Sequence, residues 1–184
     1  DGMPPYKMEL AGVPQVCFKV PTGGGKTFLA ANSIKPIFDS MPHIHPKAVV
    51  WLVPSDAILT QTYRTLTDKN HDYRKKIDVD FGNKVEIYSK QQLLNGQNFN
   101  PTSVSDNLSV FVLSYDSFRT SKKDGRKAYQ ENGSLLPFVR FKQDSGSLLE
   151  DTDETALIQV IRKLNPVVIV DDERVIICLL YTSD

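Results

Sequence analysis

Three glycines directly before a lysine and a threonine limit what this chain can be: residues 19–28 read KVPTGGGKTF. The run follows an apolar segment that predicts a strand, and it opens a pattern that predicts a helix. Glycines at such a junction let backbone N–H groups turn into one concavity without Cβ clashes, beside the positive end of the helix. We therefore predict a phosphate-binding loop formed by Thr22, Gly23, Gly24, Gly25, Lys26 and Thr27.

The two residues after the glycines have separate predicted roles. Lys26 reaches the β- and γ-phosphates of a nucleotide as a point charge, and the Thr27 hydroxyl is a ligand for Mg²⁺. The strict pattern Gly-x-x-x-x-Gly-Lys-Ser/Thr has glycine where this chain has Val20, so the longer motif is incomplete. A Gly-Lys-Thr that occurs by chance in a surface turn is the alternative, and the strand before it and the helix after it count against that alternative.

The rest of the chain alternates apolar runs with helical patterns. Runs that predict strands lie at residues 15–20, 48–53, 85–89, 109–114 and 166–171. Several are almost unbroken in Val, Ile, Leu, Phe and Trp, which is typical of strands buried on both faces of a parallel sheet. Trp51 lies inside one of these runs and is expected to be part of the core. The predicted fold class is α/β, with a doubly wound, mostly parallel sheet flanked by helices.

Helices are predicted over residues 27–38, 56–66 and 157–164. Pro36 is expected to kink or end the first helix. Ser55 is a good N-cap for the second, and Asp151 with Glu154 is expected to cap the third.

Residues 120–150 are rich in Gly, Ser, Lys and Asp and are expected to form an inserted loop, with a short hairpin around LLPFVRF. The basic run KKDGRK, residues 122–127, is interpreted as part of a solvated loop, with phosphate contact as the alternative.

A second chemical motif ends the last predicted strand, where PVVIVDDE places three acids in a row. A phosphate loop needs a carboxylate at the end of a neighbouring strand to hold the metal and direct water. We assign Asp172 to the metal and Glu173 to the attacking water, with Asp171 as the second candidate for the metal. The alternative is that the acids only solvate the end of a strand.

Composition sets the class of protein and little more. The 184 residues carry 22 Lys+Arg and 22 Asp+Glu, so no global basic field attracts nucleic acid and any such binding has to rest on a local surface. The two cysteines form no disulfide or zinc pattern, and no segment has the length and apolarity of a membrane span. We expect a cytoplasmic protein without membrane association.

Taken together, the motifs resemble the first RecA-like lobe of superfamily two helicases and translocases of the DEAD/DEAH-like group. The closest likeness is to the helicase (Res) subunit of type III restriction enzymes. The resemblance covers about residues 13 to 173 and rests on PTGGGKT, VDDE, VPSDAILTQT (53–62) and VLSYDSF (112–118). It implies a RecA-like P-loop NTPase lobe over residues 1–173 that hydrolyses ATP with Mg²⁺ to move on nucleic acid, DNA more than RNA.

By the same resemblance, a set of residues lies along the sugar-phosphate backbone: Pro54, Ser55, Gln61, Thr62, Ser114 and Tyr115. A plain N-cap is the alternative for Ser55, and core packing is the alternative for Ser114 and Tyr115. The resemblance also implies a second RecA-like lobe, which these residues do not contain, and a methylase or specificity subunit as a possible partner.

The chain departs from the family after Glu173, where Arg174 and Val175 replace the expected small residue and the histidine or aspartate that follows it. We predict that residues 174–184 are a non-native tail and that the chain without a second lobe is nearly inactive. Two other functions stay open. One is a different P-loop NTPase or kinase, against which Val20 and the lack of clustered lid arginines count. The other is a nucleotide-binding remnant without activity.

Overall fold

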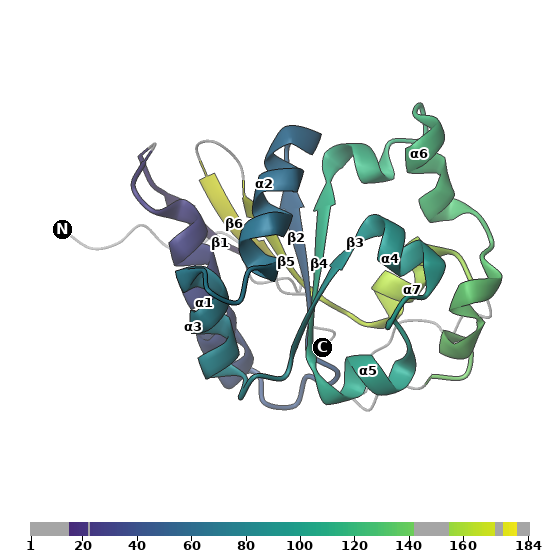
Figure 1. The fold of residues 1–184 in the computed structure, drawn as a ribbon, viewed down its shortest axis with the longest axis horizontal. Helices are drawn as coiled ribbons and strands as arrows, with labels where there is room; N and C mark the ends of the chain where they lie inside the picture. Colours follow the sequence, from purple (N-terminus) through teal and green to yellow (C-terminus); the bar gives the residue numbers. More distant parts are fainter. Residues whose placement is uncertain (1–14, 22, 142–154, 172–174, 180–184) are drawn as a thin grey trace.

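The computed structural model describes residues 15–21, 23–141, 155–171 and 175–179. Within them lies one sheet in the strand order β1-β6-β5-β2-β4-β3, with helices on both faces (Figure 1). The strands are β1 (Gln15–Lys19), β2 (Ala48–Val53), β3 (Val85–Ser89), β4 (Leu108–Ser114), β5 (Val167–Asp171) and β6 (Val175–Leu179). From β5 through β2 and β4 to β3 the pairing is parallel, whereas β6 is antiparallel to both β5 and β1. The α/β class and the mostly parallel sheet are therefore confirmed.

Helices of different length cover the two faces of the sheet. One face carries α1 (Lys26–Ser40), α2 (Asp56–Thr67) and α3 (Asp72–Asp80), which pack on one core cluster. The other face carries α4 (Lys90–Asn95), α5 (Pro101–Asp106) and α7 (Leu157–Lys163). After β4 the chain continues through η1 (Tyr115–Phe118), α6 (Lys123–Arg126), η2 (Lys127–Tyr129) and η3 (Gly133–Phe138).

Strand β2 shows why the apolar runs are unbroken. Trp51 and Val53 pack into the core on the α1 side, while Val50, which points to the opposite face, packs into the core on the α7 side. Because successive side chains of a strand alternate between faces, a strand that is covered on both sides needs apolar residues at every position.

Of the two outcomes expected at Pro36, a kink or the end of the helix, the second was wrong. Pro36 lies inside α1, which continues to Ser40. Ile34 and Phe38, on either side of the proline, are 0% and 2% exposed, so packing against the sheet holds the helix together across the missing hydrogen bond. Helix α7 begins at Leu157 with Ala156 as its N-cap and no side-chain cap, and the expected capping residues Asp151 and Glu154 lie outside the described residues.

The expected hairpin around LLPFVRF was also wrong. Residues 133–138 form the 3₁₀ helix η3 instead, in which Leu135 and Phe138 are buried against the α7-side core. Two apolar residues three positions apart share one face of a 3₁₀ helix, because that helix has three residues per turn. A strand would have pointed them to opposite faces.

The sheet brings the ends of its parallel strands to one edge. The glycine loop follows β1, Ser55 follows β2, Lys90 follows β3, and Asp171 ends β5. In open α/β sheets, ligands bind outside the carboxyl ends of the strands. Among the described residues, no helix is both long and apolar enough to span a bilayer.

Tyr88 gives a test of this core by pH. The side chain is 1% exposed, its hydroxyl donates to the Asn98 carbonyl at 3.0 Å, and it lies 3.0 Å from the Ser103 hydroxyl. Burial raises the pKa of Tyr88 above its ordinary value, the hydrogen bond with Ser103 partly opposes this shift, and the nearby Glu86 carboxylate adds to it. The folded state therefore favours the neutral phenol.

We expect the unfolding free energy of the wild-type protein to fall relative to that of Tyr88→Phe as pH rises above about 10. Only the unfolded chain ionises this tyrosine readily, so its contribution is complete below the unfolded pKa and is lost above it. Urea unfolding of both proteins at about pH 8 and about pH 10.5 measures the change. A difference between the two proteins that is the same at both pH values would contradict the assignment.

Candidate nucleotide-binding site

Each glycine of the loop has its own physical reason. Gly23 and Gly25 have φ of 78° and 79°, in the left-handed region that residues with a Cβ rarely adopt. Gly24 instead closes a tight turn, because its N–H donates to the Pro21 carbonyl at 2.9 Å. A Cβ at Gly24 would lie 2.7 Å from Val20 Cγ1 and 2.9 Å from the Pro21 oxygen. The loop as folded therefore requires glycine at all of these positions.

The anion-binding end of the loop is the first turn of α1. Gly25 is the N-cap, and the first helical hydrogen bond after it runs from the Leu29 N–H to the Gly25 carbonyl at 2.9 Å. The N–H groups of Lys26, Thr27 and Phe28 precede that bond, so no helical carbonyl accepts from them. The Gly24 N–H was expected to face the ligand as well, but its bond to Pro21 directs it into the turn. Thr22 lies outside the described residues.

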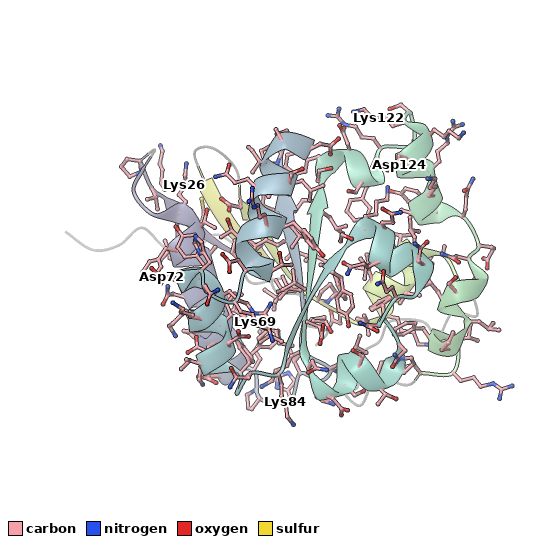
Figure 2. The ribbon with its side chains drawn as sticks, viewed as in Figure 1. Lys26, Lys69, Asp72, Lys84, Lys122 and Asp124 are labelled. Atoms are coloured by element: carbon pink, nitrogen blue, oxygen red, sulfur yellow. The ribbon has the colours of Figure 1, made fainter. Side chains whose placement is uncertain are left out.

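Lys26 is the first residue of α1 and lies at the end of the helix beside the loop (Figure 2). No acidic residue lies in that first turn. The helix end and the lysine are therefore both positive, which favours a phosphate group at this place.

The carboxylate that meets the loop is Asp171. The Thr27 hydroxyl donates to Asp171 Oδ2 at 3.2 Å, which joins α1 to the end of β5. Asp172 and Glu173, the residues first assigned to the metal and to the water, lie outside the described residues. Hydroxyl and carboxylate oxygens are the ligands that Mg²⁺ prefers, so Thr27 and Asp171 fit a magnesium site.

The sequence contained a signal for Asp171 that was not used. Side chains along β5 alternate, and Val167, Ile169 and Asp171 are its buried residues. Val167 and Ile169 pack in the core that α1 covers, so the same alternation turns Asp171 toward the loop.

Trp51 also belongs to this site, although the sequence indicated only a core residue. It is 0% exposed, and its indole N–H donates to Asp171 Oδ2 at 3.3 Å. A buried tryptophan N–H needs an acceptor, and that requirement is the signal that could have linked Trp51 to a polar group.

The residues expected to contact nucleic acid are only partly accessible. Ser55 is the N-cap of α2, where its hydroxyl accepts from the Ile58 N–H at 3.4 Å. Pro54 and Tyr115 are half-buried at the same edge of the sheet, and Gln61 is exposed on α2.

Burial argues against two members of that set. Thr62 is 6% exposed, on the side of α2 that packs inward. Ser114 is 1% exposed, and its hydroxyl donates to Asp56 Oδ1 at 2.8 Å. Neither hydroxyl is exposed enough to contact a nucleic-acid strand at the surface, so Thr62 and Ser114 are not among the nucleic-acid contacts that we propose. Ser114 instead joins the end of β4 to the start of α2.

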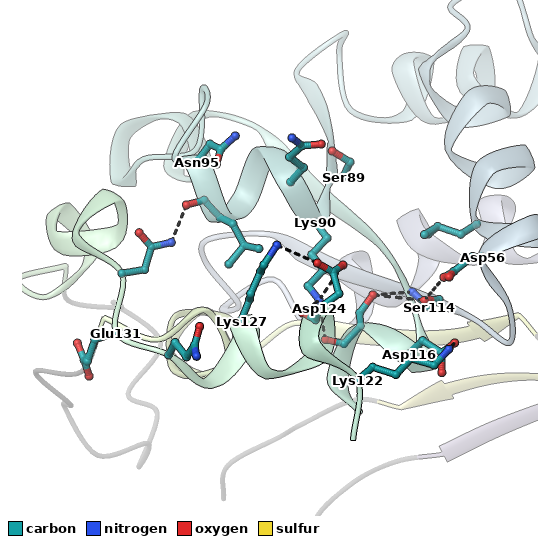
Figure 3. A pocket seen from close by; sticks show the side chains of 16 residues that line it. Asp56, Ser89, Lys90, Asn95, Ser114, Asp116, Lys122, Asp124, Lys127 and Glu131 are labelled. Atoms are coloured by element: carbon teal, nitrogen blue, oxygen red, sulfur yellow. Dashed lines mark hydrogen bonds and ion pairs between the residues drawn. The ribbon is translucent and has the colours of Figure 1, made fainter. Parts of the chain in front are cut away.

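Beside these residues lies a cavity of about 810 Å³, between α2, the start of α4 and the segment after β4 (Figure 3). Lys90 crosses it: its ammonium donates to the carbonyls of Ser117 at 3.1 Å and Asp124 at 2.5 Å. Burial lowers the pKa of Lys90, and the Asp124 carboxylate opposes this shift. The lysine thereby fixes the segment after β4 to the start of α4.

Acids pair with much of the basic run in this segment. Lys122 and Arg119 both pair with Asp116 and together lower the pKa of that carboxyl, mainly through the hydrogen bond from Lys122. Lys127 pairs with Asp124 at 3.0 Å and lowers the pKa of Asp124. Lys122 and Lys127 already form ion pairs within the protein, which favours the interpretation of this run as a solvated surface segment over its alternative, contact with phosphate groups.

The comparison with protein families decides what kind of chain carries this geometry. The sequence model of the type III restriction enzyme, res subunit, matches residues 8–173. The chain belongs to the type III res-subunit family. This is a family of helicase-like ATPases, so the glycine loop and the strand-end acid lie in a chain of the class that the sequence resembled. No curated protein and no solved structure gave a match.

Proposed function

We propose that this chain is the ATP-binding lobe of a DNA helicase or translocase, in which hydrolysis of ATP with Mg²⁺ drives movement on the nucleic acid. The observation that carries the proposal is the hydrogen bond of 3.2 Å between the Thr27 hydroxyl and Asp171. It brings a potential metal ligand from the start of α1 next to one at the end of β5, directly beside the glycine loop.

The residues have distinct tasks in this proposal. Lys26 and the N–H groups at the start of α1 hold the phosphates, and Thr27 with Asp171 holds Mg²⁺. Mg²⁺ held there would supply positive charge that offsets the negative charge of the phosphate oxygens. Glu173 remains our candidate for polarising the attacking water, and Asp172 remains a further candidate metal ligand, both from the sequence pattern.

The nucleic-acid surface in this proposal is the carboxyl edge of β2 and β4. It consists of Pro54, Ser55, Gln61 and Tyr115, with DNA preferred to RNA on the family likeness alone. The proposed helicase or translocase function further implies a cytoplasmic location, a second RecA-like lobe and a methylase or specificity subunit as a partner.

The first experiment measures ATP binding by the 184-residue chain, with and without Mg²⁺, by equilibrium dialysis. We expect binding that Mg²⁺ strengthens. Hydrolysis is then followed on a protein that includes a second lobe, with DNA or RNA of one sequence added. Stimulation by DNA is expected, whereas a rate that no nucleic acid changes would contradict the motor. Transfer of the γ-phosphate to an acceptor instead of water would favour the kinase.

A further inference from the structure

Trp51 and Thr27 donate to the same oxygen of one carboxylate. The indole N–H lies 3.3 Å from Asp171 Oδ2, and the Thr27 hydroxyl lies 3.2 Å from that oxygen. Asp171 is 9% exposed and Trp51 is 0% exposed, so the hydrogen bond from the indole is shielded from bulk water, whereas the bond from Thr27 is only partly buried. A buried carboxylate is costly unless hydrogen bonds satisfy it, which makes these donors important to its position.

The two donors differ in freedom. The Thr27 hydroxyl can rotate about one bond, and in the proposed function it becomes a ligand for Mg²⁺. The indole cannot move with the Thr27 hydroxyl, because Trp51 lies in the middle of β2 between its neighbours Val112 of β4 and Ile169 of β5. An indole N–H is also a donor only, so it can offer Asp171 nothing but a hydrogen bond.

Packing alone does not require tryptophan here. The other buried residues of the core on the α1 side are aliphatic residues, Met41 and Phe38, and a phenylalanine at position 51 would supply an aromatic ring without a donor. The indole N–H is what connects β2 to the carboxylate at the end of β5.

We propose that Trp51 is a positioning residue for the metal site: its N–H holds the Asp171 carboxylate in the orientation that accepts Mg²⁺, whether or not Thr27 also donates to it. This inference rests on the proposed function, since it assigns Trp51 to the Mg²⁺-ATP site. Groups that orient metal ligands typically change metal affinity by about 10- to 100-fold when they are lost.

The chain contains one tryptophan, so this hydrogen bond can be removed almost without changing shape. Growth of a tryptophan auxotroph on β-(benzothien-3-yl)alanine replaces only Trp51, putting sulfur where the indole has N–H. Trp51→Phe is the genetic counterpart. ATP binding is measured by equilibrium dialysis in EDTA and over a series of Mg²⁺ concentrations, and urea unfolding checks that each protein is folded.

We expect ATP affinity in EDTA to be unchanged, because Lys26 and the helix N-terminus are untouched. The Mg²⁺ concentration for half-maximal effect should rise about tenfold in both altered proteins. In an Asp171→Asn background, the isostere should cause no further change, because the group that it positions is gone.

An unaltered Mg²⁺ dependence in the isostere would overturn the role of Trp51 and leave the proposed function standing. Equal loss of ATP affinity with and without Mg²⁺ would also overturn it, since that is the signature of a structural role only. If the unaltered protein fails to bind ATP, or binds it independently of Mg²⁺, the proposed function itself fails and this inference fails with it.

Discussion

Lys26→Ala is expected to reduce ATP hydrolysis by at least about 100-fold and to weaken ATP binding strongly. The ammonium is carried on the first residue of α1, where the N–H groups and the helix dipole already favour an anion. A lysine at this place meets the phosphates as charge develops on them, and alanine leaves no positive side chain in the first turn. Hydrolysis is measured by phosphate release on a protein that includes a second lobe, and binding is measured by dialysis on the 184-residue chain.

Lys35→Ala is the matched control. Lys35 lies on the same helix and pairs with Asp39 at 2.6 Å, with 41% and 58% of the two side chains exposed. Exposed pairs of this kind contribute about 0–1 kcal/mol, so we expect full ATP binding and nearly unchanged stability. If Lys26→Ala binds and hydrolyses ATP as well as Lys35→Ala does, the glycine loop is not the ATP site.

Strands β2 to β5 could be predicted from the sequence because burial on both faces leaves a strong pattern, whereas β6 (Val175–Leu179) was not predicted. The apolar runs of β2, β3, β4 and β5 each contribute to two cores at once, as Val50 and Trp51 do on opposite faces of β2. The glycine loop could be predicted for a similar reason, since left-handed φ values and a tight turn restrict the residue types that fit. In both cases the constraint falls on consecutive residues, so it leaves a pattern that can be seen in the local sequence.

The short helices were not predicted because tertiary contacts define them. Helix α3 is highly polar, and it is held by Arg74, which bonds Asp78 at 2.8 Å and the carbonyls of Leu66 and Val85. Those acceptors belong to α2, α3 and the start of β3, so the sequence of α3 alone does not predict these hydrogen bonds. Helix α4 has six residues, and the capping box of Ser89 and Gln92 sets where it starts.

The choice among the three acids needed the register of the sheet. The sequence alone does not say which face of β5 the side chain of Asp171 points to. That is known only once Val167 and Ile169 are seen to pack in the core that α1 covers, because side chains two positions apart in a strand share a face. Likewise, the burial of Thr62 and Ser114 depends on which side of α2 and β4 is covered. Sequence motifs identify the chemical groups, and packing decides which of them reach the site.

Gly125→Ala is expected to destabilise the protein by about 3 kcal/mol, the largest stability effect that we predict for an added methyl group. A Cβ at Gly125 would meet the backbone of Arg119, at 2.7 Å from its carbonyl carbon, 2.9 Å from its nitrogen and closer still to its oxygen. These are backbone atoms of a turn in which the Lys122 N–H donates to the Arg119 carbonyl at 3.1 Å, so they cannot move aside alone. Helix α6 would have to lift away.

Lifting α6 would also break the bond from Lys90 to the Asp124 carbonyl and open one wall of the cavity beside the proposed DNA surface. Gly133→Ala separates this effect from a general intolerance of substitution after β4, because a Cβ at Gly133 meets nothing within 4 Å. We expect Gly133→Ala to stay within about 0.5 kcal/mol of the wild type in urea unfolding. Equal destabilisation by both variants would mean that close packing of α6 on Arg119 is not what holds this segment. A large loss of unfolding free energy in Gly125→Ala alone would show that the wall of the cavity depends on Gly125, which the sequence indicated only as part of a solvated loop.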